Sequence, residues 1–283
     1  MTVLEAIHKS TEFLAKKSVE SPRLQTELLL AHLLKMPRMK LYLNFDRVLS
    51  ATETDALREF VKRRGQREPL QHITGTTSFC GFEIAVSRHV LVPRPETEML
   101  AELGWTFLVT CHSSPVTALD FCTGSGCIAI ALATKSPTAK IMATDIAPEA
   151  LTLAAKNALR NKVAEQIEFR QGDGFTTLAS GMQFNLIVSN PPYIPSAEIA
   201  TLEPEVRDFD PRTALDGGAD GLEFYRLIAS QAGAFLKPDG KVMVEFGDGQ
   251  AEAIRKIFET EKWIVEAVKE DYSQRTRILI AGK

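Results

Sequence analysis

The chain has 283 residues, enough for one large domain or two, and its 45% hydrophobic and 24% charged residues are typical of a globular protein. The net charge of −3 argues against an overall electrostatic attraction to nucleic acid or to an anionic membrane. The four cysteines form no C-x-x-C pair and the five histidines show no ligand spacing, so we expect no bound metal.

The charge is unevenly distributed. Residues 1–68 hold 13 Lys and Arg against 9 Asp and Glu, whereas the remainder holds 20 against 27. The basic segment suits an acidic or RNA-containing partner, or simply a solvated helical surface. The first 17 residues contain no apolar run of signal-peptide length, and the apolar stretch near residues 28–34 is too short to span a bilayer. Together with the sparse cysteines, these features predict a cytoplasmic protein without membrane association.

The first 68 residues are predicted to form a small all-α helical bundle. The first helix, over residues 3–17, places Val3, Ile7, Phe13 and Leu14 on one stripe. A second helix opens at residues 21–22 and has leucines at helical spacing, and a third over 51–65 follows Ser50, a suitable N-cap. From residue 69 the pattern changes to two strands, over 71–77 and 82–86, which we interpret as a β-hairpin linker spanning 69–90.

Strands and helices alternate over residues 91–283. Helices are predicted over 96–110, 127–135, 148–161, 221–236 and 250–260. Strands are predicted over 116–121, 140–145, 166–171, 184–189, 241–246, 263–269 and 276–281. This alternation indicates an α/β fold, a doubly wound sheet with helices on both faces.

A nucleotide site is expected beyond the carboxyl ends of the strands, at the point where the strand order reverses. The first strand of this region runs into the glycine-containing loop 122–126, where the backbone can approach a ligand beside a helix N-terminus. Asp145 ends the second strand, 21 positions after Gly124, where a carboxylate can accept both ribose hydroxyls. Asp173 offers another acceptor at the same edge, or caps a loop. This half of the site fits NAD and S-adenosylmethionine equally well.

The fourth strand ends in Asn190-Pro191-Pro192-Tyr193, and this sequence distinguishes between the two cofactors. The prolines keep the backbone extended and offer carbonyl acceptors without N–H donors. Asn190 Oδ1 and the Pro191 carbonyl can each accept a hydrogen bond from one N–H group of a planar nitrogen. These two bonds direct the lone pair of the nitrogen at a methyl sulfonium. Tyr193 can stack on the planar group. A rigid strand exit is the plainer interpretation, but methyl transfer explains the set better than hydride transfer does.

Four stretches together resemble the peptide chain release factor glutamine methyltransferases. They are REPLQHITG at 67–75, VPRPETE at 92–98, NPPY at 190–193 and ALDGGADGL at 214–222. The likeness runs from about residue 67 to the end, and VPRPETE is its most specific part. It implies a Rossmann-like class I S-adenosylmethionine-dependent methyltransferase domain over 91–283.

The resemblance also implies the activity, which is methylation of the side-chain amide nitrogen (N5) of the glutamine in the Gly-Gly-Gln motif of class I release factors. It implies that residues 1–68 bind the release factor, and we expect a monomer without direct nucleic-acid contacts. By position, Asn190, Pro191 and Tyr193 are the implied catalytic residues, and Asn190, Pro191, Pro192 and Tyr193 hold the glutamine. The implied cofactor-binding residues are Cys122, Thr123, Gly124, Ser125, Gly126, Asp145, Asp173, Gly174 and Asn190.

Two positions depart from the family pattern. The family usually has glycine at Cys122, so the loop is expected to keep a φ that cysteine tolerates, and many members have a bulkier residue at Gly174. The enzymatic alternatives are an adenine-N6 or other nucleic-acid amino methyltransferase and a ribosomal protein glutamine methyltransferase. A nucleic-acid enzyme is expected to have a strongly basic groove, which the net −7 of residues 69–283 does not favour. The non-catalytic alternative is a ribosome or release-factor binding module.

Overall fold

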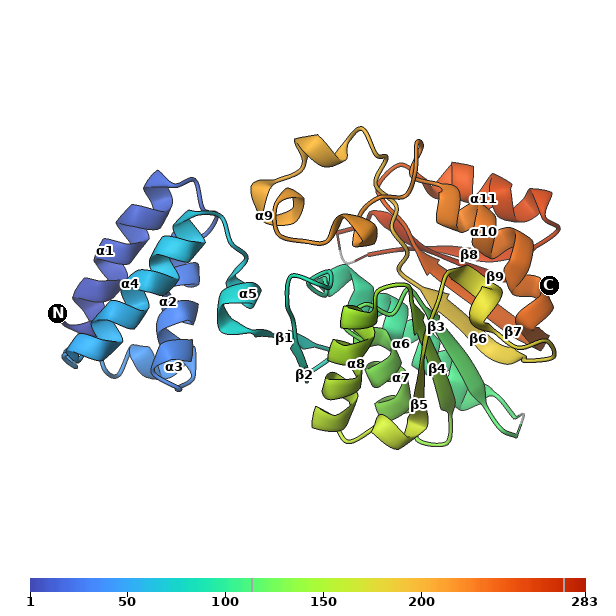
Figure 1. Cartoon of the computed structure of the whole chain (residues 1–283), viewed down its shortest axis with the longest axis horizontal. Coiled ribbons are helices and arrows are strands. Elements are labelled where there is room, and N and C mark those ends of the chain that lie inside the picture. The colour runs from blue at the N-terminus through green and yellow to red at the C-terminus, as the bar shows by residue number, and fades with distance from the viewer. Residues whose placement is uncertain (113, 272) are drawn as a thin grey trace. The chain divides into compact units, whose positions relative to one another are not determined.

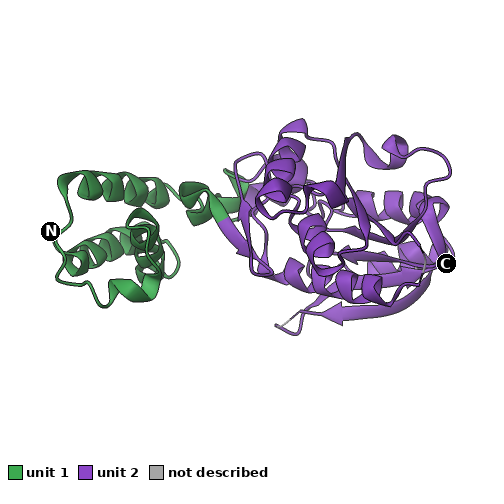
Figure 2. Ribbon diagram, turned by 90° about the horizontal axis from the view of Figure 1, so that it is seen from below, with its two compact units in different colours: residues 1–76, 203–209 green, residues 77–202, 210–283 purple. Residues whose placement is uncertain are grey.

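The computed structural model describes residues 1–112, 114–271 and 273–283, and the chain divides into two compact units (Figure 2). The helical unit consists of residues 1–76 and 203–209, and the α/β unit of residues 77–202 and 210–283. The helical unit therefore extends past residue 68 and includes a short segment from the second half of the sequence. No helix in the described ranges is both long and apolar enough to cross a membrane.

The helical unit is built from short helices around one apolar core. They are α1 Val3–Lys16, α2 Pro22–Leu33, α3 Arg38–Leu41, α4 Ala51–Gly65, α5 Leu70–Thr74 and α9 Pro204–Arg207 (Figure 1). Thr2 and Ser50 each form a capping box, so the N-cap predicted at Ser50 is confirmed. The predicted stripe of the first helix is wrong at Phe13, which is 40% exposed. Val3, Ile7 and Leu14 do pack into the core.

Two arginines at the end of α4 hold the short helix α9 in the helical unit. Arg64 is buried, and its Nη2 lies 2.8 Å from Glu205 Oε1. Arg67 Nη2 lies 2.8 Å from Glu203 Oε2 and 2.6 Å from Glu205 Oε2. Removing one partner of such a buried pair leaves an uncompensated charge, so these contacts fix the segment firmly once it is formed.

The strand predicted over residues 71–77 is wrong, because residues 70–74 form helix α5. Pro69 precedes the helix with a φ suited to its start, and Ile73 is buried in the core of the helical unit. Gly75 ends the helix in a left-handed conformation at φ 79°. Strand β1 Thr76–Phe79 begins only after it and pairs with β2 Phe82–Ala85.

The α/β unit contains a seven-stranded sheet. In spatial order its strands are β5 Ile167–Gln171, β4 Lys140–Asp145, β3 Thr117–Phe121, β6 Phe184–Ser189, β7 Leu236–Glu245, β9 Thr276–Gly282 and β8 Ile264–Glu270. The first five are parallel, and β9 runs antiparallel to both of its neighbours. The predicted alternation is confirmed, although β7 begins at Leu236, where a helix had been expected to end.

Helices cover both faces of the sheet (Figure 1). One face packs on α6 Pro95–Thr110, α7 Cys127–Lys135 and α8 Pro148–Arg160, and the other on α10 Glu223–Gln231 and α11 Ala251–Thr260. Alternate residues of β3 enter the two cores, Ala118 on the first face and Leu119 on the second. Short 3₁₀ turns occupy Ala164–Gln166, Gly174–Thr177, Ile199–Thr201, Arg212–Ala214 and Ala232–Phe235.

Candidate active site

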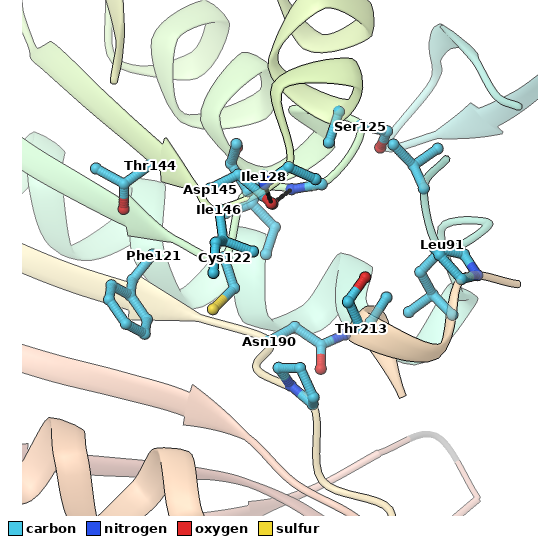
Figure 3. Close-up of a pocket in the computed structure, with 18 of the residues that line it drawn as sticks. Leu91, Phe121, Cys122, Ser125, Ile128, Thr144, Asp145, Ile146, Asn190 and Thr213 are labelled. Carbon is cyan, nitrogen blue, oxygen red and sulfur yellow. Dashed lines mark hydrogen bonds between the residues drawn. The ribbon is translucent and has the colours of Figure 1, made fainter. Parts of the chain in front are cut away.

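The strand order reverses between β3 and β6. From β3 the chain proceeds to β4 and β5 on one side of the sheet, and then returns to β6 and β7 on the other. The carboxyl ends of β3, β4 and β6 therefore meet at one edge. One pocket at this edge is lined by residues that follow all three strands, including Cys122, Asp145 and Asn190 (Figure 3).

The glycine-containing loop after β3 is held by a buried carboxylate that the sequence analysis did not assign. Asp120 Oδ2 accepts the Thr123 hydroxyl at 2.6 Å and the Ala129 N–H at 3.0 Å. Burial raises the pKa of Asp120 to about 7, although these two hydrogen bonds lower it. An acid directly before a glycine loop was visible in the sequence, but its contact with α7 was not.

Three residues of this loop have left-handed backbones, Cys122, Gly124 and Gly126, and Cys122 is one of the two departures from the family pattern. Cys122 has a φ of 63°, which costs a non-glycine residue about 1–2 kcal/mol. The loop thus keeps the conformation that glycine prefers. Gly126 has a φ of 79°, and a Cβ there would come within 2.9 Å of the Ala154 Cβ. The close approach of the start of α7 to α8 therefore depends on glycine.

Asp145 ends β4 and links the loop to the next helix. Its Oδ2 accepts the Gly124 N–H at 2.8 Å, and its Oδ1 accepts the Ala147 N–H at 2.9 Å. Burial raises its pKa, and the backbone N–H groups of Ala147, Gly124 and Ile146 oppose that rise. Each oxygen keeps a lone pair after accepting one hydrogen bond. This pocket-lining carboxylate can therefore accept hydrogen bonds from two further hydroxyl groups.

Asp173 and Gly174 line the same pocket after β5. Asp173 is exposed, and the backbone N–H of Gly172 donates to the Asp145 carbonyl at 3.0 Å. Gly174 has a φ of 59°, and a Cβ there would come within 3.2 Å of the Leu227 side chain. A bulkier residue would need both a different backbone and a displaced Leu227, which explains glycine in this chain.

Asn190 lies at the end of β6 with its two amide atoms in different surroundings. Its Nδ2 donates to the Thr97 hydroxyl at 3.1 Å. Its Oδ1 is buried, yet no hydrogen-bond partner for it exists among the described residues. No described backbone N–H donates to the carbonyl of Pro191. A buried acceptor without a partner costs about 1–3 kcal/mol, so this end of the strand is prepared for a donor from outside the chain.

The segment after Pro192 is fixed on two sides. The Ile194 N–H donates to the Leu215 carbonyl at 2.9 Å, and the Gly217 N–H donates to the Ile194 carbonyl at 2.9 Å. On the other side, Gln250 Nε2 donates to the Tyr193 carbonyl at 2.9 Å. These contacts hold the two prolines in one conformation before any substrate arrives.

The Tyr193 ring packs against the core on the α10 and α11 face instead of lining the pocket. A Cβ at Gly247 would lie 3.0 Å from the Tyr193 Cδ2, so the ring rests on that glycine. Burial raises the pKa of Tyr193 to about 12, so its hydroxyl is neutral at physiological pH. The ring therefore does not line the pocket, in contrast to the position expected for stacking on a bound planar group.

The structure brings most of the predicted residues to one pocket. Those that line it are Cys122, Thr123, Gly124, Ser125, Asp145, Asp173, Gly174, Asn190 and Pro192. Gly126, Pro191 and Tyr193 support the lining without forming part of it. Sequence reasoning missed Thr97 as a lining residue and also Ile146, which is 54% exposed beside Asp145 and offers an apolar surface to a base.

The site has no activated nucleophile and no metal cluster. Burial raises the pKa of the Cys122 thiol well above its usual value, and the carboxylates of Asp145 and Asp120 raise it further. A neutral thiol is a poor nucleophile. The described residues include no group of three or more His, Cys, Asp or Glu side chains that could hold a metal ion.

A buried acceptor without a partner among the described residues, Asn190 Oδ1, lies beside a nucleotide-type pocket, an arrangement that fits methyl transfer to a planar nitrogen better than hydride transfer. Fold and site together thus define a methyltransferase. The PrmC N-terminal domain family matches residues 5–75, and the methyltransferase small domain family matches residues 102–202. A methyltransferase structure from Pyrococcus furiosus has a TM-score of 0.53 at 21% identity, covering 78% of this chain and 97% of that one, and shows the same fold.

Relatives in sequence make the family clear. The release factor glutamine methyltransferase of Geobacter sulfurreducens is 45% identical over 257 residues, covering 91% of this chain and 88% of that protein. The corresponding protein of Rhodospirillum rubrum is 43% identical over 265 residues, covering 94% and 80%. The chain belongs to the release factor glutamine methyltransferase family.

Proposed function

We propose that this protein transfers the methyl group of S-adenosylmethionine to the side-chain amide nitrogen of the glutamine in the Gly-Gly-Gln motif of class I release factors. Membership of the family supports the substrate. One observation in the site supports the chemistry: Asn190 Oδ1 is a buried acceptor without a partner among the described residues. A primary amide supplies the N–H donors that this position lacks.

The lining of the pocket fits the cofactor. The Asp145 carboxylate has free lone pairs for the two ribose hydroxyls, and Ile146 offers an apolar surface to the adenine. Cys122, Thr123, Gly124, Ser125 and Gly126 would follow the methionine portion, and Asp173, Gly174 and Asn190 would complete the site. When bound, S-adenosylmethionine supplies an electrophilic methyl group on a sulfonium.

The chain contributes position and hydrogen bonds to the reaction. Asn190 Oδ1 and the Pro191 carbonyl accept the two N–H bonds of the glutamine, so its nitrogen becomes pyramidal and its lone pair turns toward the methyl group. The bound cofactor would supply the methyl group, and the methylated nitrogen would then lose one N–H proton to water. Pro192 keeps the clamp extended, and the Tyr193 carbonyl, which accepts from Gln250 Nε2, anchors it. No side chain with a shifted pKa has to act as a base.

The two parts of the chain are proposed to have different roles. The helical unit is proposed as the release-factor binding domain, the β1–β2 hairpin as the linker and the rest of the α/β unit as the methyltransferase domain, with the bounds that the structure gives in place of 1–68, 69–90 and 91–283. A substrate loop alone offers few contacts, so a second surface has to supply affinity. The proposal includes action in the cytoplasm as a monomer, without direct contact with nucleic acid or a membrane.

Mass spectrometry of a purified class I release factor incubated with the protein and labelled S-adenosylmethionine tests the proposal. We expect a single added methyl group on the glutamine of Gly-Gly-Gln, and none on a release factor with Gly-Gly-Ala at that site. Label transferred instead to DNA, to RNA or to a ribosomal protein, with the release factor unmodified, would contradict it.

A further inference from the structure

Thr97 connects the first turn of α6 to the clamp. It lies in the VPRPETE stretch, is 3% exposed, and accepts a hydrogen bond from Asn190 Nδ2 at 3.1 Å. Its own backbone N–H is already bonded to the Arg94 carbonyl at 3.1 Å. The threonine hydroxyl has one proton to donate. If another group accepts that proton, the hydroxyl can act toward Asn190 only as an acceptor.

Glu245 can accept a hydrogen bond from that hydroxyl, because its Oε2 is buried without a hydrogen-bond partner among the described residues. It ends β7, which pairs with β6 in parallel register up to Ser189 and Val244, so Asn190 and Glu245 come next on adjacent strands. Glu245 is buried, with only 3% of the residue exposed. Side-chain hydrogen bonds with Thr97 and with Asn190 both favour its ionised form.

A carboxylate can only accept hydrogen bonds, and this fixes the direction of the whole set. The Thr97 hydroxyl accepts from Asn190 Nδ2, and its own proton is then left for Glu245. We propose that Thr97 and Glu245 are positioning residues, which hold the Asn190 amide with Oδ1 toward the substrate nitrogen. This inference rests on the proposed function and adds two residues to it.

The opposite orientation of the amide would abolish the clamp, because Nδ2 would then face the N–H bonds of the glutamine. Protonated Glu245 permits that orientation, since its O–H can donate to Thr97, and Thr97 can then donate to Asn190 Oδ1. Burial raises the pKa of Glu245 to about 7. Glu96 raises this pKa further, whereas Thr97, Arg277 and Asn190 lower it.

Two tyrosines complete the surroundings of Glu245. The Tyr225 hydroxyl donates to the Glu245 carbonyl at 2.8 Å, and the charge of Glu245 raises the pKa values of both Tyr193 and Tyr225. Both phenols stay neutral near pH 7, so Glu245 is the group of this cluster that changes charge there. We therefore expect turnover to rise with pH through about 7.

Thr97→Val and Thr97→Ser form the matched pair that tests the hydroxyl. Thr97→Val keeps the shape and loses the hydroxyl, so kcat should fall about tenfold, the effect expected for one uncharged hydrogen bond. Thr97→Ser should stay within about twofold of wild type. In Thr97→Val the Kd for S-adenosylmethionine should change less than kcat does. Wild-type kcat in Thr97→Val, or equal losses in two folded variants, would overturn the proposal.

Glu245→Gln supplies a second test, whether or not Thr97→Val folds. Glutamine lets Thr97 donate or accept, so the rise of kcat through pH 7 should disappear. A pH profile identical to wild type would refute the role of Glu245.

A third readout does not need turnover: the side-chain N–H₂ NMR signals of Asn190 should shift through pH 7 in wild type and not in Glu245→Gln. If wild type failed to methylate Gly-Gly-Gln while this shift occurred, the proposed function alone would fail; absence of the shift in wild type would overturn the positioning role.

Discussion

Replacing Glu245 with Gln should change how the stability of the α/β unit depends on pH. The pKa of Glu245 rises from 4.5 to about 7 on folding, chiefly because the carboxyl group is buried. Below pH 4.5 the group is protonated in both the folded and unfolded states and costs nothing. Above pH 7 it is ionised in both, and the folded state bears the full cost of the buried charge.

The size of the effect follows from the shift. Each pKa unit corresponds to 1.36 kcal/mol, so the difference in unfolding free energy between wild type and Glu245→Gln should change by about 3 kcal/mol over the whole range. Most of this change should fall between pH 5 and pH 8. Stability of wild type relative to the variant decreases as pH rises, because the folded state binds the proton more tightly.

Urea denaturation followed by tryptophan fluorescence measures this difference. Trp105 and Trp263 are the two tryptophans of the sequence, and both lie in the α/β unit, so the signal reports on that unit. Subtracting the curve of the variant from that of wild type at each pH cancels other buried acids, such as Asp120. Parallel curves from pH 5 to pH 8 would show that Glu245 is ionised at low cost, and the reasoning would be wrong.

Three further substitutions test the site itself. Asn190→Ala removes an acceptor that acts in the transition state, so kcat should fall about 10²–10³-fold with a smaller change in KM. Asn190→Asp should retain more activity than Asn190→Ala. Near wild-type turnover in Asn190→Ala would refute the proposed clamp. Asp145→Ala should weaken S-adenosylmethionine binding by about 1–3 kcal/mol in calorimetry, through loss of charge-assisted bonds to ribose, and an unchanged Kd would remove that role. Cys122→Gly should keep activity and gain about 0–1 kcal/mol of stability, since relief of the left-handed strain is offset by the greater chain entropy of glycine. Loss of turnover in a normally folded Cys122→Gly protein would show that the thiol has a chemical role.

The sequence by itself determined most of the α/β unit. The strand that ends before Cys122, the acid Asp145 and the prolines after Asn190 are local signals, each readable within a few residues. Because parallel strands of such a sheet end at one edge, locating the strands was sufficient to bring these residues together. The pocket at the switch point confirms that placement for nine of the predicted residues, Cys122, Thr123, Gly124, Ser125, Asp145, Asp173, Gly174, Asn190 and Pro192.

Tertiary structure decided what depends on partners far apart in the chain. The strand predicted near Ile73 is a helix, because that side chain is buried in the core of the helical unit. The segment 203–209 belongs to the helical unit because Arg64 and Arg67 hold its glutamates. Neither contact leaves a periodic pattern in the neighbouring residues, so propensity and spacing give no indication of it.

The orientation of the Asn190 amide is the clearest case of this division. The sequence shows that an asparagine stands before two prolines, and this suffices to predict an acceptor pair. Which amide atom faces the substrate depends on Thr97 and Glu245, which come from the start of α6 and the end of β7. Hydrogen-bond direction is set by the protons of all the groups in contact, and only the folded chain brings those groups together.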